Sequence, residues 1–250
     1  MKKILMIVTA LVFGAGVSFA YDEGPVTNGG TIQGHVKFSG AAPKLEAIKV
    51  QKNMDFCGNS VPAEGLVVGK DGGVKFAVGY LDKVSKGKPI DRAAQTLFAE
   101  AKCIFKPHVI AVVKGTDIAI NNEDTILHNI NISVDGIQRF NKGQPKQNQL
   151  LVAKLRQTGV GDVTCDSHTH MKSWMIILDH PYFAISDESG TFNIKDVPAG
   201  KYTLKVWHES WKVKSHDDDG RPIYGDPIVL SQEVEVKAGA TEHAKFEIKP

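Results

Sequence analysis

The sequence predicts an all-β protein made of two packed β-sandwiches, the second smaller than the first. Segments of alternating apolar and polar residues recur along the chain, and turns that contain Gly or Pro separate them. Helix signals are scarce: the one fair candidate covers residues 90–102, and the same stretch can also form a loop. The length of 250 residues, 42% of them hydrophobic, suffices for one large domain or two small ones.

The first sandwich is predicted from three strand-forming segments. Residues 109–122 predict a strand, a turn at Lys114-Gly115 and a second strand, which together form a hairpin. Residues 160–164 predict a strand that leads into a cysteine. Residues 173–180 predict a half-buried strand.

A domain boundary is predicted near residue 180, where the chain reads Asp179-His180-Pro181. Beyond it, the sequence predicts two strands separated by the turn DVPAG and then a terminal hairpin, at residues 191–196, 201–208 and 233–250. The join is short, so we expect the two sandwiches to pack against each other. The expected domains are therefore residues 21–180 and 181–250.

The first twenty residues have the form of a secretory signal peptide. Two lysines at the start precede an apolar run over residues 4–12, and small residues follow up to Ala20. The alternative, a membrane anchor, needs about 20 apolar residues, more than this run provides. We expect cleavage after Ala20 and a periplasmic or secreted protein with no membrane span.

The charge of the chain gives no reason to expect a polyanionic partner. The formal net charge is +2, and removing Lys2 and Lys3 with the signal peptide takes it to zero. A neutral protein has no general attraction for nucleic acid or for an anionic membrane.

Three cysteines, Cys57, Cys103 and Cys165, pose a pairing question. Two of them can form a disulfide in an oxidising compartment, which leaves one to explain. Cys165 lies in the motif CDSHTHM, so we expect Cys57 and Cys103 to pair. The alternative is two free buried thiols.

The motif CDSHTHM at residues 165–171 predicts part of a copper site. A blue-copper centre needs two imidazoles, one thiolate and a weakly bound axial thioether. Cys165, His168 and Met171 occur in a suitable order, and His128 follows a strand upstream. Zinc accepts Cys and His ligands too, but a thioether adds nothing to a zinc site, so Met171 favours copper.

Three further residues offer alternative roles at this site. Met175 can replace Met171 as the axial ligand, although packing within a strand is its more ordinary role. His170 adds a competing imidazole, or forms an exposed edge for electron transfer. His108 begins the strand of the first hairpin and can return toward the metal, with a structural role as the alternative.

The stretch FKPHVIAVVKGTDIAINNEDTILHNI at residues 105–130 resembles the cupredoxin pattern. CDSHTHM resembles the shortest cupredoxin ligand loop, C-x-x-H-x-x-M, of the amicyanin type. The resemblance is good over residues 103–180 and loose over 28–100. It implies a Greek-key sandwich with copper ligands His128, Cys165, His168 and axial Met171. It also implies that Asn129 joins the His128 segment to the cysteine loop through hydrogen bonds.

Residues 181–250 resemble the carboxypeptidase regulatory-like domain, a small transthyretin-like sandwich. The matching pieces are S-D-x-x-G-x-F-x-I, V-P-A-G-x-Y-x-L and V-W-H. The resemblance implies a structural or interaction module without catalytic residues. Its loop at residues 208–226 contains His208, His216 and the run Asp217 to Asp219, but lacks the alternation of an EF-hand, so we expect a surface loop rather than a cation site.

The expected function is that of an extracytoplasmic single-electron carrier with one type 1 copper and no catalytic activity. The resemblance implies a redox partner such as a c-type cytochrome or an oxidoreductase, with electrons passing through an exposed edge of His168 or His170. Copper storage or delivery, a copper enzyme, and a structural pair of sandwiches without redox function are the alternatives. An enzyme needs further H-x-H motifs, and the one present, His168–His170, shares residues with the loop.

Overall fold

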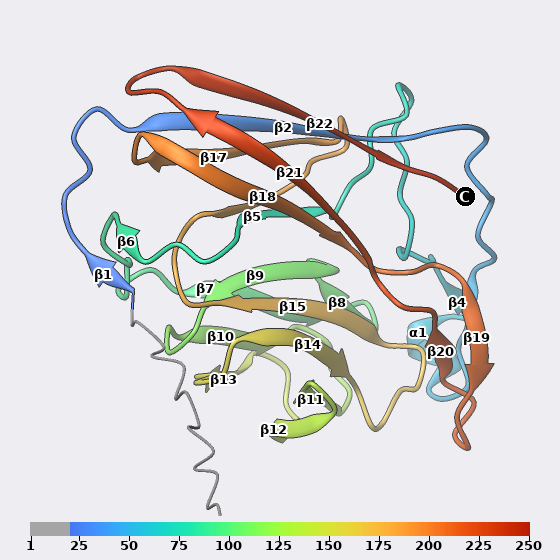
Figure 1. Cartoon of the computed structure of the whole chain (residues 1–250). Helices are drawn as coiled ribbons and strands as arrows, with labels where there is room; N and C mark the ends of the chain where they lie inside the picture. Colours follow the sequence, from blue (N-terminus) through green and yellow to red (C-terminus); the bar gives the residue numbers. More distant parts are fainter. Residues whose placement is uncertain (1–20) are drawn as a thin grey trace, which may run out of the picture.

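The computed structural model describes residues 21–250, and the predicted signal peptide lies outside this range. The described chain forms 22 strands and one helix of four residues, α1 (Met54–Cys57), which confirms the all-β class. The strands build two sandwiches that pack on each other (Figure 1). No helix within residues 21–250 has the length and apolar character needed to cross a membrane.

The first sandwich is formed by strands β7 to β15. Its five-stranded sheet has the order β12 (Ile137–Gln144), β11 (His128–Val134), β14 (Gly159–Thr164), β15 (Lys172–Leu178) and β9 (Val109–Val113). Its four-stranded sheet has the order β13 (Gln149–Ala153), β10 (Ile118–Asn122), β7 (Thr96–Ala101) and β8 (Ile104–Lys106). Inward-facing residues of both sheets, such as Phe98, Ile120 and Ile132, form one core with Cys165 at its edge.

The second sandwich takes its strands from both ends of the chain. Its four-stranded sheet has the order β16 (Phe183–Ile185), β5 (Val78–Leu81), β18 (Gly200–His208) and β21 (Ile228–Val236). Its three-stranded sheet has the order β17 (Thr191–Val197), β2 (Gly30–Phe38) and β22 (Thr241–Ile248). Three short pairs lie outside the sandwiches: β1 (Asp22–Glu23) with β6 (Lys86–Gly87), β3 (Ile48–Lys49) with β4 (Ser60–Val61), and β19 (Val213–His216) with β20 (Pro222–Tyr224).

This pairing divides the chain differently from the single boundary predicted near residue 180. β15 does end at Leu178, but β2 pairs with β17 and β22, and β5 lies between β16 and β18. Residues 21–95 therefore supply strands to the second sandwich, and the first sandwich lies between two parts of the second in the sequence. Periodicity identifies strands but not their partners, which explains the difference.

The helix candidate at residues 90–102 is wrong, and the loop alternative holds for residues 90–95 but not for 96–101. Asp91 accepts hydrogen bonds from the backbone N–H groups of Ala93 and Ala94, and strand β7 begins at Thr96. Parallel pairing with β10 and antiparallel pairing with β8 place β7 inside a sheet. Tertiary pairing thus overrides a composition that favours a helix.

The two predicted hairpins contain the expected strands, but the strands do not pair with each other. β9 pairs with β15 and β10 pairs with β7 and β13, so the turn at Lys114-Gly115 connects the two sheets of one sandwich. Gly115 has a φ of +81°, which suits such a turn. β21 and β22 likewise belong to opposite sheets of the second sandwich.

The sandwiches share an apolar interface, as the short join between them predicts. Val109 and Ile176 from the first sandwich pack with Val78 and Trp207 from the second. The rings of Trp174 and Trp207 meet edge to face at 5.6 Å between centroids. The relative position of the sandwiches is therefore set by buried contacts rather than by a flexible linker.

Candidate metal centre

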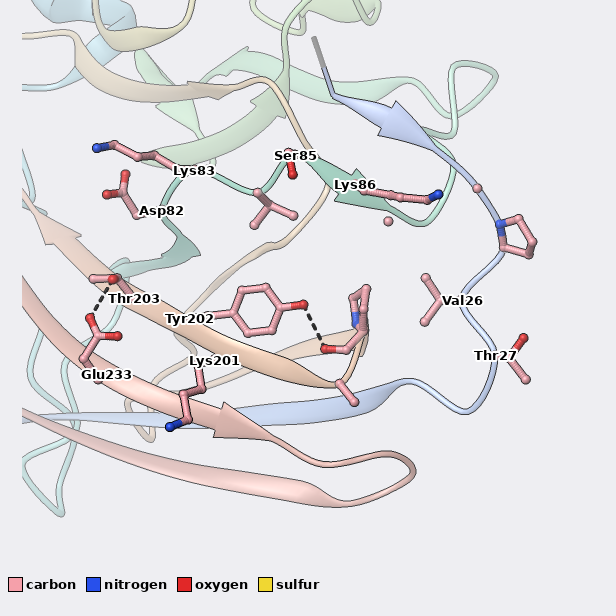
Figure 2. A pocket seen from close by; sticks show the side chains of 16 residues that line it. Val26, Thr27, Asp82, Lys83, Ser85, Lys86, Lys201, Tyr202, Thr203 and Glu233 are labelled. Carbon is pink, nitrogen blue, oxygen red and sulfur yellow. Dashed lines mark hydrogen bonds between the residues drawn. The ribbon is translucent and has the colours of Figure 1, made fainter. Parts of the chain in front are cut away.

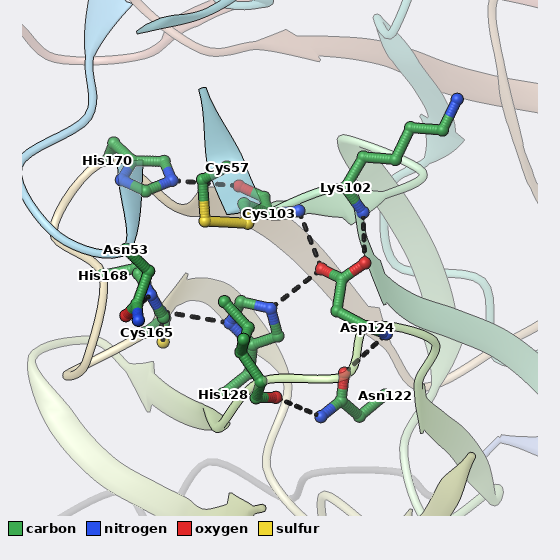
Figure 3. Close-up of a disulfide and its surroundings, with 11 residues drawn as sticks. Asn53, Cys57, Lys102, Cys103, Asn122, Asp124, His128, Cys165, His168 and His170 are labelled. Atoms are coloured by element: carbon green, nitrogen blue, oxygen red, sulfur yellow. Dashed lines mark hydrogen bonds and ion pairs between the residues drawn. A yellow bond between two sulfur atoms is a disulfide. The ribbon is translucent and has the colours of Figure 1, made fainter. Parts of the chain in front are cut away.

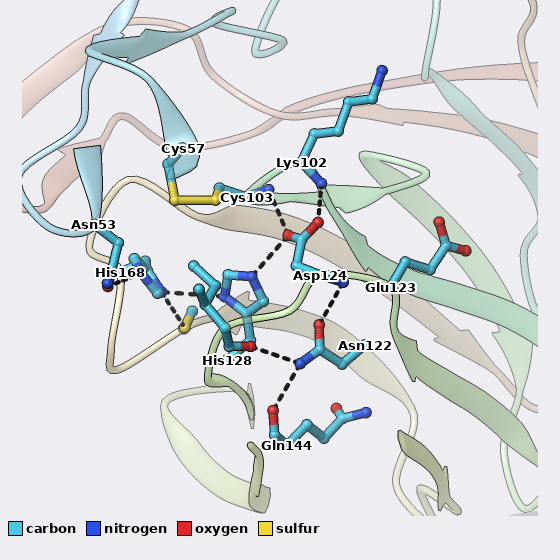
Figure 4. Close-up of polar contacts among 12 residues, drawn as sticks. Asn53, Cys57, Lys102, Cys103, Asn122, Glu123, Asp124, His128, Gln144 and His168 are labelled. Carbon is cyan, nitrogen blue, oxygen red and sulfur yellow. Dashed lines mark hydrogen bonds and ion pairs between the residues drawn. A yellow bond between two sulfur atoms is a disulfide. The ribbon is translucent and has the colours of Figure 1, made fainter. Parts of the chain in front are cut away.

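Three side chains with metal-binding atoms converge at one end of the first sandwich. The ligand atoms of His128, Cys165 and His168 all lie within 4.8 Å of one another, and all three residues are buried. Nδ1 of His128 lies 3.1 Å from Nδ1 of His168, and Sγ of Cys165 lies 3.8 Å from the same atom of His168 (Figures 3 and 4). Two imidazole nitrogens and one sulfur therefore face a common point.

The pairing of β11 with β14 explains this convergence. The antiparallel register places Asn131 opposite Thr164, so the start of β11 and the end of β14 lie at the same edge of the sheet. His128 is the first residue of β11, and Cys165 directly follows β14. The backbone N–H of Asn129 also donates to Sγ of Cys165 at 3.4 Å.

The side chain of Asn129 links the histidine strand to the cysteine loop. Its Oδ1 accepts hydrogen bonds from the backbone N–H groups of Asp166 and Ser167. Its Nδ2 donates to Asp166 Oδ2 at 3.0 Å and to Asn141 Oδ1 at 2.8 Å. These bonds hold the first turn of the loop against β11.

Met171 and Met175 are both fully buried in the core that contains Cys165. Met171 closes the loop, because its backbone N–H donates to the carbonyl of His168 at 3.0 Å. Met175 lies within β15, opposite Gly161 of β14. The loop position of Met171, three residues after His168, keeps it as the axial candidate, whereas Met175 packs inside the sheet.

The expectation of an exposed imidazole edge is wrong for both candidates. His168 is 1% exposed and His170 is 4% exposed. His170 bonds through Nε2 to the carbonyl of Cys103 at 3.1 Å, and its ring meets that of His168 at 5.7 Å between centroids. His168 is buried because a segment outside the first sandwich, which contains Asn53, covers its ring. Local sequence does not reveal such a contact.

His108 does not reach the metal group but pairs with a buried carboxylate at the interface of the sandwiches. Its Nε2 bonds to Glu209, whose other oxygen accepts a hydrogen bond from the indole N–H of Trp174 at 2.8 Å. Burial opposes charge on His108, but the carboxylates of Glu209 and Glu64 together outweigh burial and raise the pKa of the imidazole. His108 therefore has a structural role.

Asp124 bonds to the second ring nitrogen of His128, a contact that was not predicted from the sequence. Its Oδ2 lies 2.9 Å from Nε2 of His128. This leaves Nδ1 of His128 directed at the point that it shares with Cys165 Sγ and His168 Nδ1, where a metal would bind. Asp124 also accepts hydrogen bonds from the backbone N–H groups of Lys102 and Cys103 at 2.7 and 2.8 Å. A usable signal was present: a carboxylate four residues before the histidine in DTILH.

A cap from residues 53–57 covers His168. Oδ1 of Asn53, just before α1, lies 3.0 Å from Nε2 of His168 (Figure 3). The predicted disulfide between Cys57 and Cys103 is confirmed, with 5.5 Å between the Cα atoms, and it fastens α1 to the turn between β7 and β8. Asn53 lies in the region where the family resemblance is loose, so its role was not predicted.

The titration behaviour of the two imidazoles suits metal binding. Burial, then the neighbouring His128 and His170, lowers the pKa of His168 to about 4. Burial also lowers the pKa of His128, although Asp124 opposes this shift. Both imidazoles are therefore neutral near pH 7, which is the form that binds a metal. Burial raises the pKa of the Cys165 thiol, and N–H donors from the backbone oppose the rise.

A pocket-like hollow lies elsewhere, on the second sandwich (Figure 2). It has a volume of about 680 Å³, and its lining includes Lys83, Lys201 and Tyr202. The hydroxyl of Tyr202 donates to the carbonyl of Pro198 at 2.9 Å, and Thr203 donates to Glu233 at 2.6 Å. None of the candidate metal ligands lines it.

Comparison with known families matches residues 160–244 to polysaccharide lyase family 4, domain II. This corrects the expected resemblance to a carboxypeptidase regulatory-like domain. The match begins in β14 and runs into β22, so it includes strands of both sandwiches. A search of curated proteins found no match.

Solved structures similar to this chain include copper proteins. Amicyanin from Paracoccus versutus is 15% identical with a TM-score of 0.31, and the match covers 40% of this chain and 96% of amicyanin. A purple cupredoxin from Nitrosopumilus maritimus is 18% identical with a TM-score of 0.30, over 33% of this chain and 98% of that one. A Cu-containing nitrite reductase from Thermus scotoductus SA-01 is 17% identical with a TM-score of 0.30, over 34% of this chain and 22% of the reductase.

Proposed function

We propose that this protein is a mononuclear copper protein that carries single electrons outside the cytoplasm. The observation that supports this function best is the convergence of His128 Nδ1, His168 Nδ1 and Cys165 Sγ in a buried site. Two imidazoles with one thiolate are the equatorial donors of a blue-copper centre, and Met171 is the proposed axial donor.

The donor set fits copper better than the common alternatives. Calcium and magnesium require oxygen donors, and this group offers nitrogen and sulfur. Structural zinc sites use four Cys or His ligands and catalytic ones keep an open position for water, whereas this buried group has three such ligands and a methionine in the same core. A bound copper ion would supply a one-electron change between Cu(I) and Cu(II).

The protein contributes a constrained and dry site. Asp124 holds the tautomer and orientation of His128, and the side chain of Asn129 holds the turn after Cys165. Both imidazoles are buried, so solvent is excluded from the ligand atoms. A site that changes little between two oxidation states has a small reorganisation cost, which suits an electron carrier.

The partner that we propose is another redox protein, such as a c-type cytochrome or an oxidoreductase. Because both His168 and His170 are covered, electrons would enter through the cap or the ligand loop rather than through a bare imidazole edge. Export through the predicted signal peptide belongs to the same proposal, and the disulfide agrees with an oxidising compartment.

Optical and EPR spectra of the purified protein after addition of Cu(II) test this function. We expect an intense thiolate-to-copper charge-transfer band in the visible range and a narrow copper hyperfine splitting. Cys165→Ser should abolish the band, whereas Ser167→Ala, two residues away and not a proposed ligand, should keep it. Binding of zinc with no visible band on copper addition would rule out the electron carrier.

Copper storage or delivery is the second candidate, and the burial of His168 under Asn53 favours storage. A covered site exchanges its metal slowly and offers no bare edge to a redox partner. Voltammetry separates the two functions: a carrier shows a reversible one-electron wave with fast exchange, whereas a storage protein that holds Cu(I) shows neither.

A further inference from the structure

The second sandwich reaches the proposed copper loop through one arginine. Arg221 lies just before β20, in the hairpin that β19 and β20 form. Its Nη1 donates to the carbonyls of Thr169 and Met171 at 3.0 and 3.2 Å, and its Nη2 donates to the carbonyl of Cys165 at 2.8 Å. One guanidinium thus joins the first, fifth and last residues of the loop at residues 165–171.

The acidic turn before Arg221 fixes its position. Oδ1 of Asp217 accepts hydrogen bonds from the backbone N–H groups of Asp219 and Arg221 at 3.1 and 2.8 Å. Gly220 takes a φ of +78°, and its N–H donates to the carbonyl of Asp217. Asp217, the first of the three consecutive aspartates, therefore stabilises a turn.

The arginine contact is mostly shielded from solvent. The side chain of Arg221 is 14% exposed, so its hydrogen bonds compete little with water. The guanidinium stays charged at all relevant pH values, and its planar fork can serve several carbonyls at once. Figure 1 shows the β19–β20 hairpin at the same end of the molecule as α1, and Gly220 lies close to Gln51 beside the cap.

We infer that Arg221 is a positioning residue of the metal centre, through which the second sandwich holds the ligand loop closed and adds a fixed positive charge beside it. This inference rests on the proposed function of the same site. Two of the three carbonyls belong to proposed ligands, Cys165 and Met171, so the clamp acts on their backbone. The nearby positive charge favours the reduced site, which carries one positive charge fewer.

Two substitutions separate the clamp from the charge. Arg221→Gln removes both, whereas Arg221→Lys keeps the charge but loses the fork. Lys214→Gln is the matched control, because Lys214 lies on the same hairpin and pairs only with the exposed Asp226 among the described residues. Circular dichroism of each metal-free variant verifies that it is folded.

Three readouts test the inference. We expect Arg221→Gln to release copper about tenfold faster or more, Arg221→Lys to release it at an intermediate rate, and Lys214→Gln to match the wild type. The reduction potential should fall in Arg221→Gln and stay near the wild-type value in Arg221→Lys. Hydrogen exchange of the amides at residues 166–171 in metal-free protein should quicken in both arginine variants.

The outcomes distinguish this inference from the proposed function. If copper release, potential and loop exchange in Arg221→Gln all equal those of Lys214→Gln, the inference is overturned. If the wild type forms no visible charge-transfer band, the proposed function fails, and loop exchange in the metal-free chain still decides the clamp: faster exchange in Arg221→Gln supports it and unchanged exchange overturns it.

Discussion

At the scale of single residues, each ring nitrogen of His128 has an assigned contact. Nδ1 faces the metal point, and Nε2 bonds to a carboxylate that is itself held by two backbone N–H groups. A carboxylate behind an imidazole makes the ring a stronger electron donor and stabilises a more positive metal. If copper binds as proposed, Asp124 would therefore set both its affinity and its reduction potential.

Asp124→Asn tests this role, because it keeps the shape of the side chain and removes its charge. We expect copper affinity to fall about tenfold and the reduction potential to rise, as measured by competition with a chelator and by voltammetry. Glu123→Gln is the control, since Glu123 is adjacent and exposed (Figure 4). An equal potential in both variants would contradict the role of Asp124.

Glu100 supplies a second prediction at this scale. It is 0% exposed, and neither carboxylate oxygen has a hydrogen-bond partner among the described residues. Burial, then the nearby Asp124, raises its pKa from 4.5 to about 8. Between these two pH values the folded protein holds a proton that the unfolded chain has released, so the free energy of unfolding must fall as pH rises.

The free energy of unfolding of the metal-free wild type should therefore decrease between pH 5 and 8 relative to that of Glu100→Gln. The difference in slope has a limit of about 1.4 kcal/mol per pH unit for one proton. Urea denaturation at several pH values measures it. Parallel pH profiles for the two proteins would show that Glu100 stays charged in the fold.

At the scale of elements, the cap over His168 is held by α1 and the disulfide. α1 has four residues and no buried side chain, so it has little packing of its own. The bond between Cys57 and Cys103 keeps Asn53 near the imidazole, and closing a loop of this size stabilises the fold by roughly 3–4 kcal/mol. The cap is thus attached by covalent chemistry rather than by a core.

Asn53→Gly tests the cap without disturbing its backbone. Asn53 has a φ of +56°, which glycine adopts freely, so the substitution removes only the contact with His168. We expect faster copper release and faster electron self-exchange with the charge-transfer band retained. Asn28→Gly is the control, because exposed Asn28 has a similar φ of +53° far from the site in the sequence. Identical rates in both variants would show that the contact between Asn53 and His168 does not control copper release or electron exchange.

At the scale of the whole molecule, the two sandwiches depend on each other. β2 and β5 come before the first sandwich in the sequence, yet their partners β16, β17, β18 and β22 come after it. Arg221 adds a contact from the second sandwich to the ligand loop. The sandwich with the candidate metal site therefore lies between two parts of the other sandwich in the sequence and is joined to it in space.

Truncation after residue 180 tests this dependence. The shortened chain would leave β2 and β5 without partners and expose the apolar interface around Val109 and Ile176. We expect an aggregating chain without a cooperative unfolding transition, measured by light scattering and calorimetry. A chain of residues 96–180 is the comparison, because it lacks the unpaired strands. A soluble, cooperatively folded chain of residues 21–180 would contradict the interleaved arrangement.

The sequence by itself determined the strands within residues 109–122, 160–180, 191–208 and 233–250, the turn at Lys114-Gly115, the cysteine pair and the set of His128, Cys165 and His168. The strands and the turn depend on periodicity and turn chemistry in adjacent residues, and the cysteines and ligands depend on residue types whose chemistry is recognisable at any separation. Only the tertiary structure decided which strands pair, that residues 96–101 form a strand, and that Asn53 and Arg221 contact the site. Those outcomes arise from contacts between residues far apart in the chain, and a pattern of neighbours carries no information about a partner a hundred residues away.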